Sequence, residues 1–293
     1  MGYLVFVTGL WAFSLSFIGV YIAGQVDSYF AILTRIVLAF LLFLPFLKPG
    51  SVPHRVKLGL MAIGAIQLGL MYVSYYQSFL LLSVPEILLF TIFTPIYITL
   101  LNDMLARRFS LLHLVTALIA VAGAALIRFE GLTENYWLGF MMVQACNLCF
   151  AIGQVAYRHL MAREQLDVPA RTVFGWFYAG ALVVAVLAYL ILGDKSAPAP
   201  APLQWGILIW LGLMASGLGY FLWNEGARRV DAGTLAIMNN MLIPAGILVN
   251  VLIWNRDADL VRLALGGAVM VVALVFNELL DRRRQAGSAA APA

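Results

Sequence analysis

Ten long apolar runs, separated by short polar segments, follow one another along the whole chain. Each run is close to the roughly 20 residues that a helix needs to cross the hydrocarbon core of a bilayer. The runs are continuous, whereas the strands of an outer-membrane barrel alternate in polarity. The pattern therefore predicts an all-α membrane protein with ten transmembrane helices, over Gly2–Gly24, Ser28–Leu47, Lys57–Phe79, Val84–Leu105, Ser110–Arg128, Tyr136–Tyr157, Thr172–Leu192, Leu203–Trp223, Ala232–Trp254 and Arg262–Leu280.

Composition supports the same class. Of the 293 residues, 63% are apolar and only 11% are charged, and the mean hydropathy is +0.94. An average soluble domain is about 45–50% apolar and about 25% charged. A water-soluble enzyme is therefore excluded, and the short loops leave no room for a soluble domain.

Lysine and arginine are distributed unevenly between the two sides of the predicted membrane. With the N-terminus inside, 13 of them fall on inner segments and 4 on outer segments, while Arg35 lies within a span. Cytoplasmic loops carry the excess of positive charge in membrane proteins, so both termini are predicted to be cytoplasmic. This bias accounts for the net charge of +4, and no nucleic-acid partner is predicted. The tail, residues 285–293, is predicted to be disordered.

Two pairs of short motifs recur at half the chain length. Thr91 precedes Pro95 by four residues and Asn240 precedes Pro244 by four, at an offset of 149. Gly69–Tyr72 resembles Gly217–Tyr220 at an offset of 148. Because each half has five spans, the second half must be inverted relative to the first. Inverted repeats build many secondary transporters, so the sequence predicts two inverted five-helix halves, 1–130 and 134–284.

The two prolines are predicted to kink their helices. Proline has no N–H and clashes with the carbonyl of residue i−4, which is that of Thr91 before Pro95 and of Asn240 before Pro244. A carbonyl released in this way needs another partner or a polar cavity. The motifs are therefore either substrate-facing positions or simple packing kinks.

Several stretches of the chain resemble a known transporter family. They are Leu10–Phe17, Ala23–Arg35, Leu88–Leu100, Ser216–Met241 and Pro244–Asn250. They are similar to the drug/metabolite transporter superfamily of EamA type, and most closely to its bacterial biotin importers. The resemblance implies a multi-pass inner-membrane carrier that imports biotin by alternating access, with the lipid bilayer and a small molecule as its partners. The alternative is an exporter of amino acids, amines or related metabolites with the same fold.

Ionisable residues inside a span are costly and point to function. Arg35 lies seven residues into its span, about 10 Å at 1.5 Å per residue. It is predicted either to bind a substrate carboxylate or to pair with Glu86. For Glu86, the alternatives are proton coupling, pairing with Arg35, or a stabilising charge at a helix N-terminus after Pro85.

Other polar and aromatic residues within the spans are candidates for contact with biotin. Biotin has a ureido edge with two N–H groups and one carbonyl, and an amide side chain offers both donor and acceptor. One of Asn239 and Asn240, together with Thr91, is predicted to bind that edge. Aromatic rings are predicted to enclose the apolar ring system. The remaining candidates, to which packing is the alternative, are Asn147, Tyr72, Tyr97 and Trp176.

No enzyme chemistry is predicted. The three histidines lie in or near loops, and no His, Asp and Glu cluster at membrane depth suits a catalytic metal. A phosphate-binding Gly-Lys-Ser/Thr loop is also missing, so neither a cofactor nor direct ATP coupling is expected. Small residues on spans 5 and 10 are predicted either to pack together or to form a homodimer surface.

Overall fold

The computed structural model describes residues 1–105, 134–164, 166, 168–230 and 232–254, together with isolated positions between 261 and 279. Every element within these residues is a helix, which confirms the all-α prediction. Predicted spans 5 and 10, the dimer surface assigned to them and the tail fall outside the described residues, apart from those isolated positions.

The helices of the first half are often interrupted by π- or 3-10 turns. The segments are α1 (Gly2–Phe17) with η1 (Ile18–Ile22), α2 (Ser28–Phe43) with η2 (Leu44–Phe46), the short turn η3 (Pro49–Ser51), α3 (His54–Gly64) with η4 (Ala65–Leu70) and α4 (Met71–Ser78), and α5 (Val84–Phe90) with η5 (Thr91–Phe93) and α6 (Thr94–Leu105).

The second half has four described helical segments. They are α8 (Glu134–Glu164), α9 (Ala170–Leu192), α10 (Pro202–Trp210) with η6 (Leu211–Leu218) and α11 (Gly219–Ala227), and α12 (Ala232–Trp254). The helix α8 continues seven residues beyond the predicted end at Tyr157. Within the described residues, seven segments are long and apolar enough to cross a membrane, and they match predicted spans 1–4 and 6–8.

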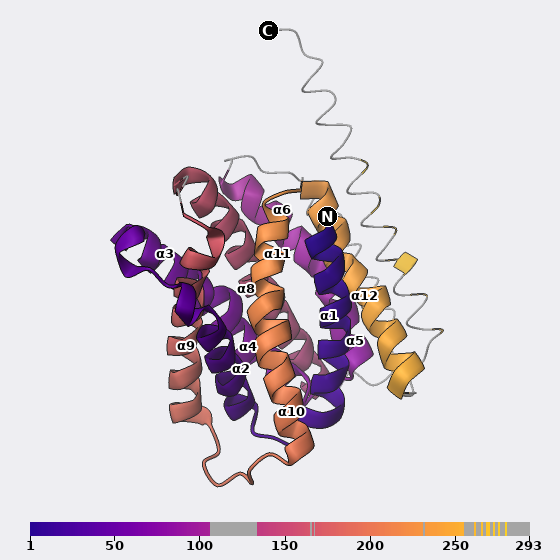
Figure 1. Ribbon diagram of the computed structural model, residues 1–293. Coiled ribbons are helices and arrows are strands. Elements are labelled where there is room, and N and C mark those ends of the chain that lie inside the picture. Colours follow the sequence, from indigo (N-terminus) through magenta and orange to yellow (C-terminus); the bar gives the residue numbers. More distant parts are fainter. Residues whose placement is uncertain are drawn as a thin grey trace.

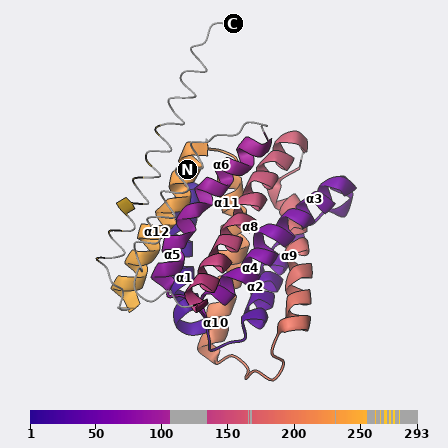
Figure 2. The ribbon, with the colours of Figure 1, turned by 180° about the vertical axis from the view of Figure 1, so that it is seen from behind.

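The segments form one bundle in which neighbours come from both halves (Figures 1 and 2). The helix α1 packs against α11 and α12, while α4 and α6 pack against α8. The helix α9 packs against both α2 and α3, and α2 also packs against η6. Large apolar side chains such as Leu187 and Ile191 stay exposed on the outer face. A broad exposed apolar surface of this kind is expected of a protein that contacts lipid.

Glycines permit the closest helix approaches. A Cβ added to Gly64 on α3 would lie 1.8 Å from the Phe177 carbonyl oxygen on α9. Gly212 on η6 would in the same way meet Leu38 on α2 at 2.8 Å. Gly64 and Gly212 are 148 residues apart, which is the offset of the sequence motifs, and π-turns adjoin both. Small residues let helix backbones pack tightly in membranes.

Positive charge collects at one end of the bundle, which we call the basic end. It holds the N-terminus, the start of α3 and of α9, and the ends of α8 and α11 (Figure 1). Lys195 lies at the opposite end, in the connection between α9 and α10. Eight of the ten described lysine and arginine residues lie at the basic end: Lys48, Arg55, Lys57, Arg158, Arg163, Arg171, Arg228 and Arg229.

Candidate functional site

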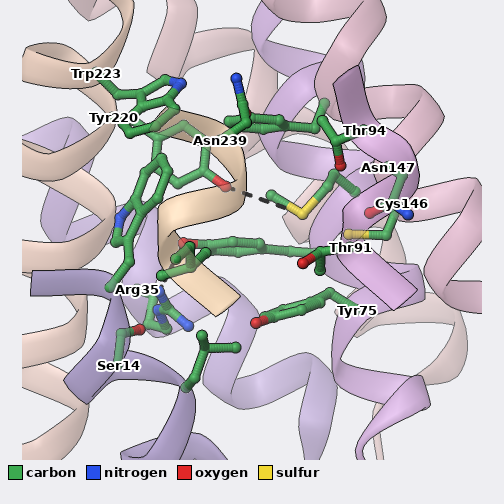
Figure 3. A pocket seen from close by; sticks show the side chains of 16 residues that line it. Ser14, Arg35, Tyr75, Thr91, Thr94, Cys146, Asn147, Tyr220, Trp223 and Asn239 are labelled. Carbon is green, nitrogen blue, oxygen red and sulfur yellow. Dashed lines mark hydrogen bonds between the residues drawn. The ribbon is translucent and has the colours of Figure 1, made fainter. Parts of the chain in front are cut away.

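A cavity in the middle of the bundle is lined by side chains from both halves (Figure 3). It encloses about 680 Å³ of space between atoms, part of it open to the outside. The first half contributes α1, α2, α4 and the join of η5 and α6, and the second half contributes α8, α11 and α12. Transporters built from inverted repeats hold substrate at this position, between the halves. We call it the central cavity.

Arg35 on α2 lies at the wall of the central cavity and is only 2% exposed. Its guanidinium donates three hydrogen bonds to neutral hydroxyls, those of Ser216 at 3.0 Å, Tyr76 at 3.0 Å and Tyr72 at 2.6 Å. It also lies 4.4 Å from the centre of the Tyr72 ring. Among the described residues, no carboxylate pairs with it. Because a buried charge without a counter-ion is costly, Arg35 is a candidate binding residue for an anion.

The π-helix η6 positions the Ser216 hydroxyl. A π-turn bonds each N–H to the carbonyl five residues back, which leaves some carbonyls in need of other donors. Trp11 Nε1 on α1 donates to the Ala215 carbonyl at 3.0 Å, and the Tyr178 hydroxyl on α9 donates to the Ser216 carbonyl at 2.9 Å. Side chains from two other helices thus fix the turn that presents this hydroxyl to Arg35.

The break before Pro95 releases a different carbonyl from the predicted one. In the 3-10 turn η5, the Thr94 N–H bonds to the Thr91 carbonyl, so this group keeps a partner. The Phe90 carbonyl loses that N–H instead, and Asn147 Nδ2 on α8 donates to it at 2.8 Å. The prediction of a free Thr91 carbonyl is therefore wrong, because the turn tightens by one residue. The break ties α5 to α8 through Asn147.

Two asparagine amides are left with their oxygens available to the cavity. Asn147 Nδ2 also donates to Gln144 Oε1 at 3.3 Å. Asn239 Nδ2 donates to the Leu235 carbonyl at 2.9 Å. Within the described part of the chain, neither Oδ1 has a hydrogen-bond donor. Both residues line the cavity, so their oxygens are placed to accept N–H groups from a ligand.

Four neighbouring aromatic rings line the cavity, and two of them, Tyr220 and Trp223, lie on the side away from Arg35 in Figure 3. The centroids of the contacting rings are 4.9 to 6.4 Å apart, at angles that range from tilted to edge-on. Such geometries are favourable for aromatic pairs. We call this group the aromatic quartet: Trp11 on α1, Phe150 on α8, and Tyr220 and Trp223 on α11.

The structure brings five of the predicted substrate residues to the central cavity, namely Arg35, Tyr72, Thr91, Asn147 and Asn239. They come from five different helical segments that are far apart in the sequence. The Thr91 hydroxyl donates to a backbone carbonyl one turn earlier, at 2.6 Å. The sequence therefore located part of the polar wall without any contact information, although Ser14, Tyr75, Thr94 and Tyr220 also line the cavity.

Three predicted substrate residues are not among the residues that line the cavity. Tyr97 donates its hydroxyl to a glutamine on α8, at 3.2 Å. Trp176 lies on α9, which packs behind α2 and α3, and its ring lies 5.2 Å from the Lys57 ammonium. Asn240 follows Asn239 by one residue, and neighbours on a helix point about 100° apart. Only one of the two can face the cavity, and the structure places Asn239 there.

Glu86 caps a helix. Its Oε2 accepts hydrogen bonds from the Ser83 N–H and hydroxyl, both at 2.8 Å, in a capping box at the start of α5. In this structure Arg35 bonds three hydroxyls instead of the Glu86 carboxylate. Glu86 bonds Ser83 at the start of α5, whereas Arg35 bonds residues on α4 and η6. The alternative prediction for Glu86, a stabilising charge at a helix N-terminus, is confirmed. Pro244 lies within α12, which continues as an α-helix through this position.

The sequence did not single out several residues that shape the site. Ser216 and Tyr76 hold the Arg35 guanidinium, and Trp11 completes the aromatic wall. The sequence did contain a signal for Ser216. This residue lies directly before Gly217, the first residue of the motif that recurs at an offset of 148. Among the described residues, no group of three or more His, Cys, Asp or Glu could hold a metal ion.

Comparison with known proteins decides the class of this membrane protein. Residues 137–278 match the EamA-like transporter family. The chain is 52% identical to a Pseudomonas aeruginosa PAO1 protein named probable biotin transporter, over 98% of this chain and 100% of that protein. It is 48% identical to the biotin transporter of Escherichia coli K12, over 94% of this chain and 91% of that protein. This chain belongs to the EamA-like transporter family.

Membership in the EamA-like family makes the chain a multi-pass membrane transporter and not an enzyme. A solved crystal structure with 20% sequence identity superposes with a TM-score of 0.66, over 97% of this chain and 99% of that one. That likeness shows a shared fold. In an EamA-like transporter, a cavity between the two halves is the expected place for the transported solute.

Proposed function

We propose that this protein imports biotin across the bacterial inner membrane by alternating access. The observation that carries the proposal is the buried Arg35, whose described partners at the cavity wall are all neutral hydroxyls. Biotin brings the carboxylate that this arginine lacks. The relatives named biotin transporter, at 48% and 52% identity over almost the whole chain, support the same substrate.

The remaining hydrogen-bonding groups of the cavity suit the two ends of biotin. A guanidinium has five N–H donors, and Arg35 uses three of them on the surrounding hydroxyls. The other two are left for the carboxylate. The Oδ1 atoms of Asn147 and Asn239 are placed to accept the two N–H groups of the ureido edge. The apolar rings of biotin would then pack against the aromatic quartet.

The cavity argues against amino acids or amines as the substrate. Either solute carries an ammonium group, which needs a carboxylate or a dense set of acceptors when it is buried. The residues that line the cavity include no aspartate or glutamate in the described part of the chain. The single ionised group there is a cation, Arg35, which would repel an amine.

Matched structural features support inverted repeats as the basis for alternating access. The π-helices η4 and η6 end 148 residues apart, at Leu70 and Leu218, and the glycine pair Gly64 and Gly212 has the same offset. Contacts between segments also come in matched pairs, since α4 packs on α8 as α11 packs on α1. With spans 5 and 10 added, this gives ten helices in two inverted halves, 1–130 and 134–284.

The basic end supports the orientation of the protein. Eight of the ten described lysines and arginines lie at that end together with the N-terminus. We therefore assign it to the cytoplasm. The connection between α9 and α10, residues 193–201, then faces the periplasm.

Uptake of labelled biotin tests the function. Proteoliposomes that contain the purified protein are expected to accumulate biotin in a saturable way. Unlabelled biotin should compete, while free amino acids should have little effect. Empty liposomes provide the control for leakage. A correctly inserted protein that takes up no biotin but releases amino acids would replace this proposal with the exporter alternative.

A further inference from the structure

Buried side-chain amides form a second polar layer, on the side of the aromatic quartet that is nearer the basic end. They are Gln67 on η4, Gln154 on α8 and Asn224 on α11, and each is at most 2% exposed. We call them the amide layer. None of the three lines the central cavity, and the contact with biotin proposed above uses none of them.

Much of the hydrogen-bonding capacity of the amide layer is unused. Gln67 Nε2 donates to Asn224 Oδ1 at 3.3 Å, and Asn224 Nδ2 donates to the Tyr220 carbonyl at 3.0 Å. Both side-chain polar atoms of Gln154 and the Oε1 atom of Gln67 are buried without a hydrogen-bond partner among the described residues. An unsatisfied amide is costly at membrane depth, so these groups need a partner that the described residues do not supply.

Helix geometry places the amide layer directly behind the quartet. On α8, Asn147, Phe150 and Gln154 recur at three- and four-residue spacing and so share one face. Four residues correspond to about 6 Å along a helix, which puts Gln154 one turn beyond the ring of Phe150. Gln67 lies against the same helix, since a Cβ added to Gly153 would come within 2.1 Å of it.

The path continues toward the basic end. One further turn along α8, the Tyr157 hydroxyl donates to Glu225 Oε1 at 3.0 Å, and Arg228 donates to the same oxygen at 2.9 Å. Arg228 also lines a hollow at the basic end between α8 and α9, which encloses about 710 Å³ including open solvent. The central cavity, the aromatic quartet, the amide layer and this hollow therefore follow one another along α8.

We propose that the amide layer is a second, transient site on the substrate path, which takes a neutral hydrogen-bonding group such as the ureido end of the substrate once the aromatic quartet opens. The free groups of Gln67 and Gln154 include both acceptors and a donor, which match a ureido group. The amide layer holds no charge, so it would bind the ureido end of the substrate only weakly and then release it. This inference rests on the proposed function and assigns the inner half of its path.

The test replaces each glutamine with methionine, which has nearly the same length and shape but no amide. Gln154→Met and Gln67→Met should leave the biotin Kd of the purified protein within about twofold, because neither residue lines the central cavity. Their maximal uptake rates in proteoliposomes should fall by about tenfold or more, since a step after binding is impaired. Gln154→Asn, which keeps the amide, should retain more uptake than Gln154→Met.

A purely structural role predicts a different result. For Gln154, whose amide has no described partner, exchange for an apolar group of the same shape should raise the melting temperature and leave uptake unchanged. For Gln67, which donates to Asn224, a purely structural role predicts lower stability with unchanged uptake. Unchanged uptake in both methionine variants overturns this inference alone, and so does a parallel loss of binding and uptake. If one variant fails to insert, the other decides. Gln25→Met, in an exposed segment, controls for the exchange itself. Absence of biotin binding by the unsubstituted protein would overturn the proposed function as well.

Discussion

Replacing Arg35 with methionine tests the assignment of the substrate carboxylate. Methionine fills much of the same space but removes the charge and all five donors. A hydrogen bond to a charged group contributes roughly 1.5–3 kcal/mol, which corresponds to about 10–150-fold in Kd. We therefore expect Arg35→Met to bind biotin more weakly by that factor.

The stability of the fold should change much less than the affinity. The three groups that Arg35 bonds are neutral hydroxyls, and two of them, on Tyr72 and Ser216, also bond each other at 2.8 Å. Removing the arginine leaves that pair intact and removes a buried charge whose desolvation is costly. The melting temperature of Arg35→Met in detergent should accordingly stay near that of the unsubstituted protein.

The decisive assay compares biotin with its charge-neutral amide. The unsubstituted protein should prefer the acid by about 10–150-fold, and Arg35→Met should bind the two ligands equally. Arg35→Lys should recover little of the preference, because an ammonium is a point charge and lacks the planar fork of the guanidinium. Arg55→Met is the control, since Arg55 is exposed and forms a surface ion pair with Glu164 at 2.8 Å.

One result would refute this reasoning directly. If Arg35→Met is folded and still prefers the acid to the amide, the carboxylate binds elsewhere. Arg35 would then be a structural residue that holds α2 to α4 and η6 through its three hydroxyl partners. A fall in melting temperature without loss of acid preference would support that structural role.

Three further outcomes follow from the packing, the break before Pro95 and the charge distribution. Gly64→Ala should lower the free energy of unfolding by about 1–3 kcal/mol or more through overpacking. Gly206→Ala, which meets nothing within 4 Å, should be neutral or slightly stabilising when thermal unfolding is measured. Asn147→Leu should weaken biotin binding and cost about 1–3 kcal/mol of stability, because the Phe90 carbonyl loses the nearer of its two side-chain donors; unchanged values would remove Asn147 from the site. A reporter fused to the C-terminus should be active in the cytoplasm, and periplasmic activity would reverse the proposed orientation.

The helices could be read from the sequence because lipid imposes a length on each of them. The apolar runs located all seven membrane-length segments of the described chain, and residue Arg35 could be identified because a charge within a run is costly. Helix ends in polar surroundings carry no such constraint. The helix α8 extends seven residues beyond the predicted end at Tyr157, to Glu164. The sequence contains no signal at Tyr157 that would end the helix there.

The partners of the polar residues could not be read in the same way. The three hydroxyls on α4 and η6 that bond Arg35 could not be predicted from the sequence. The sequence supplies the spacing along a helix but not its rotation or its neighbours, so Trp176 and Tyr97 could not be separated from Tyr72 as cavity residues. The η5 turn shows a further limit: a one-residue tightening moved the released carbonyl from Thr91 to Phe90.

Whether a buried polar group supports the fold or serves transport depends on how much of its bonding capacity the protein already uses. Tyr178 is fully buried, but its hydroxyl already donates to the backbone of η6, so it has no donor left to offer a solute. Arg35, Asn147 and Gln154 are also buried, yet each keeps donors or acceptors that no described residue occupies. Lipid cannot meet that remaining demand. Under the proposals above, a solute that carries a carboxylate at one end and a ureido group at the other meets it in sequence, first at Arg35 and Asn147 and then at Gln154, which would favour opening of the loaded carrier along that route.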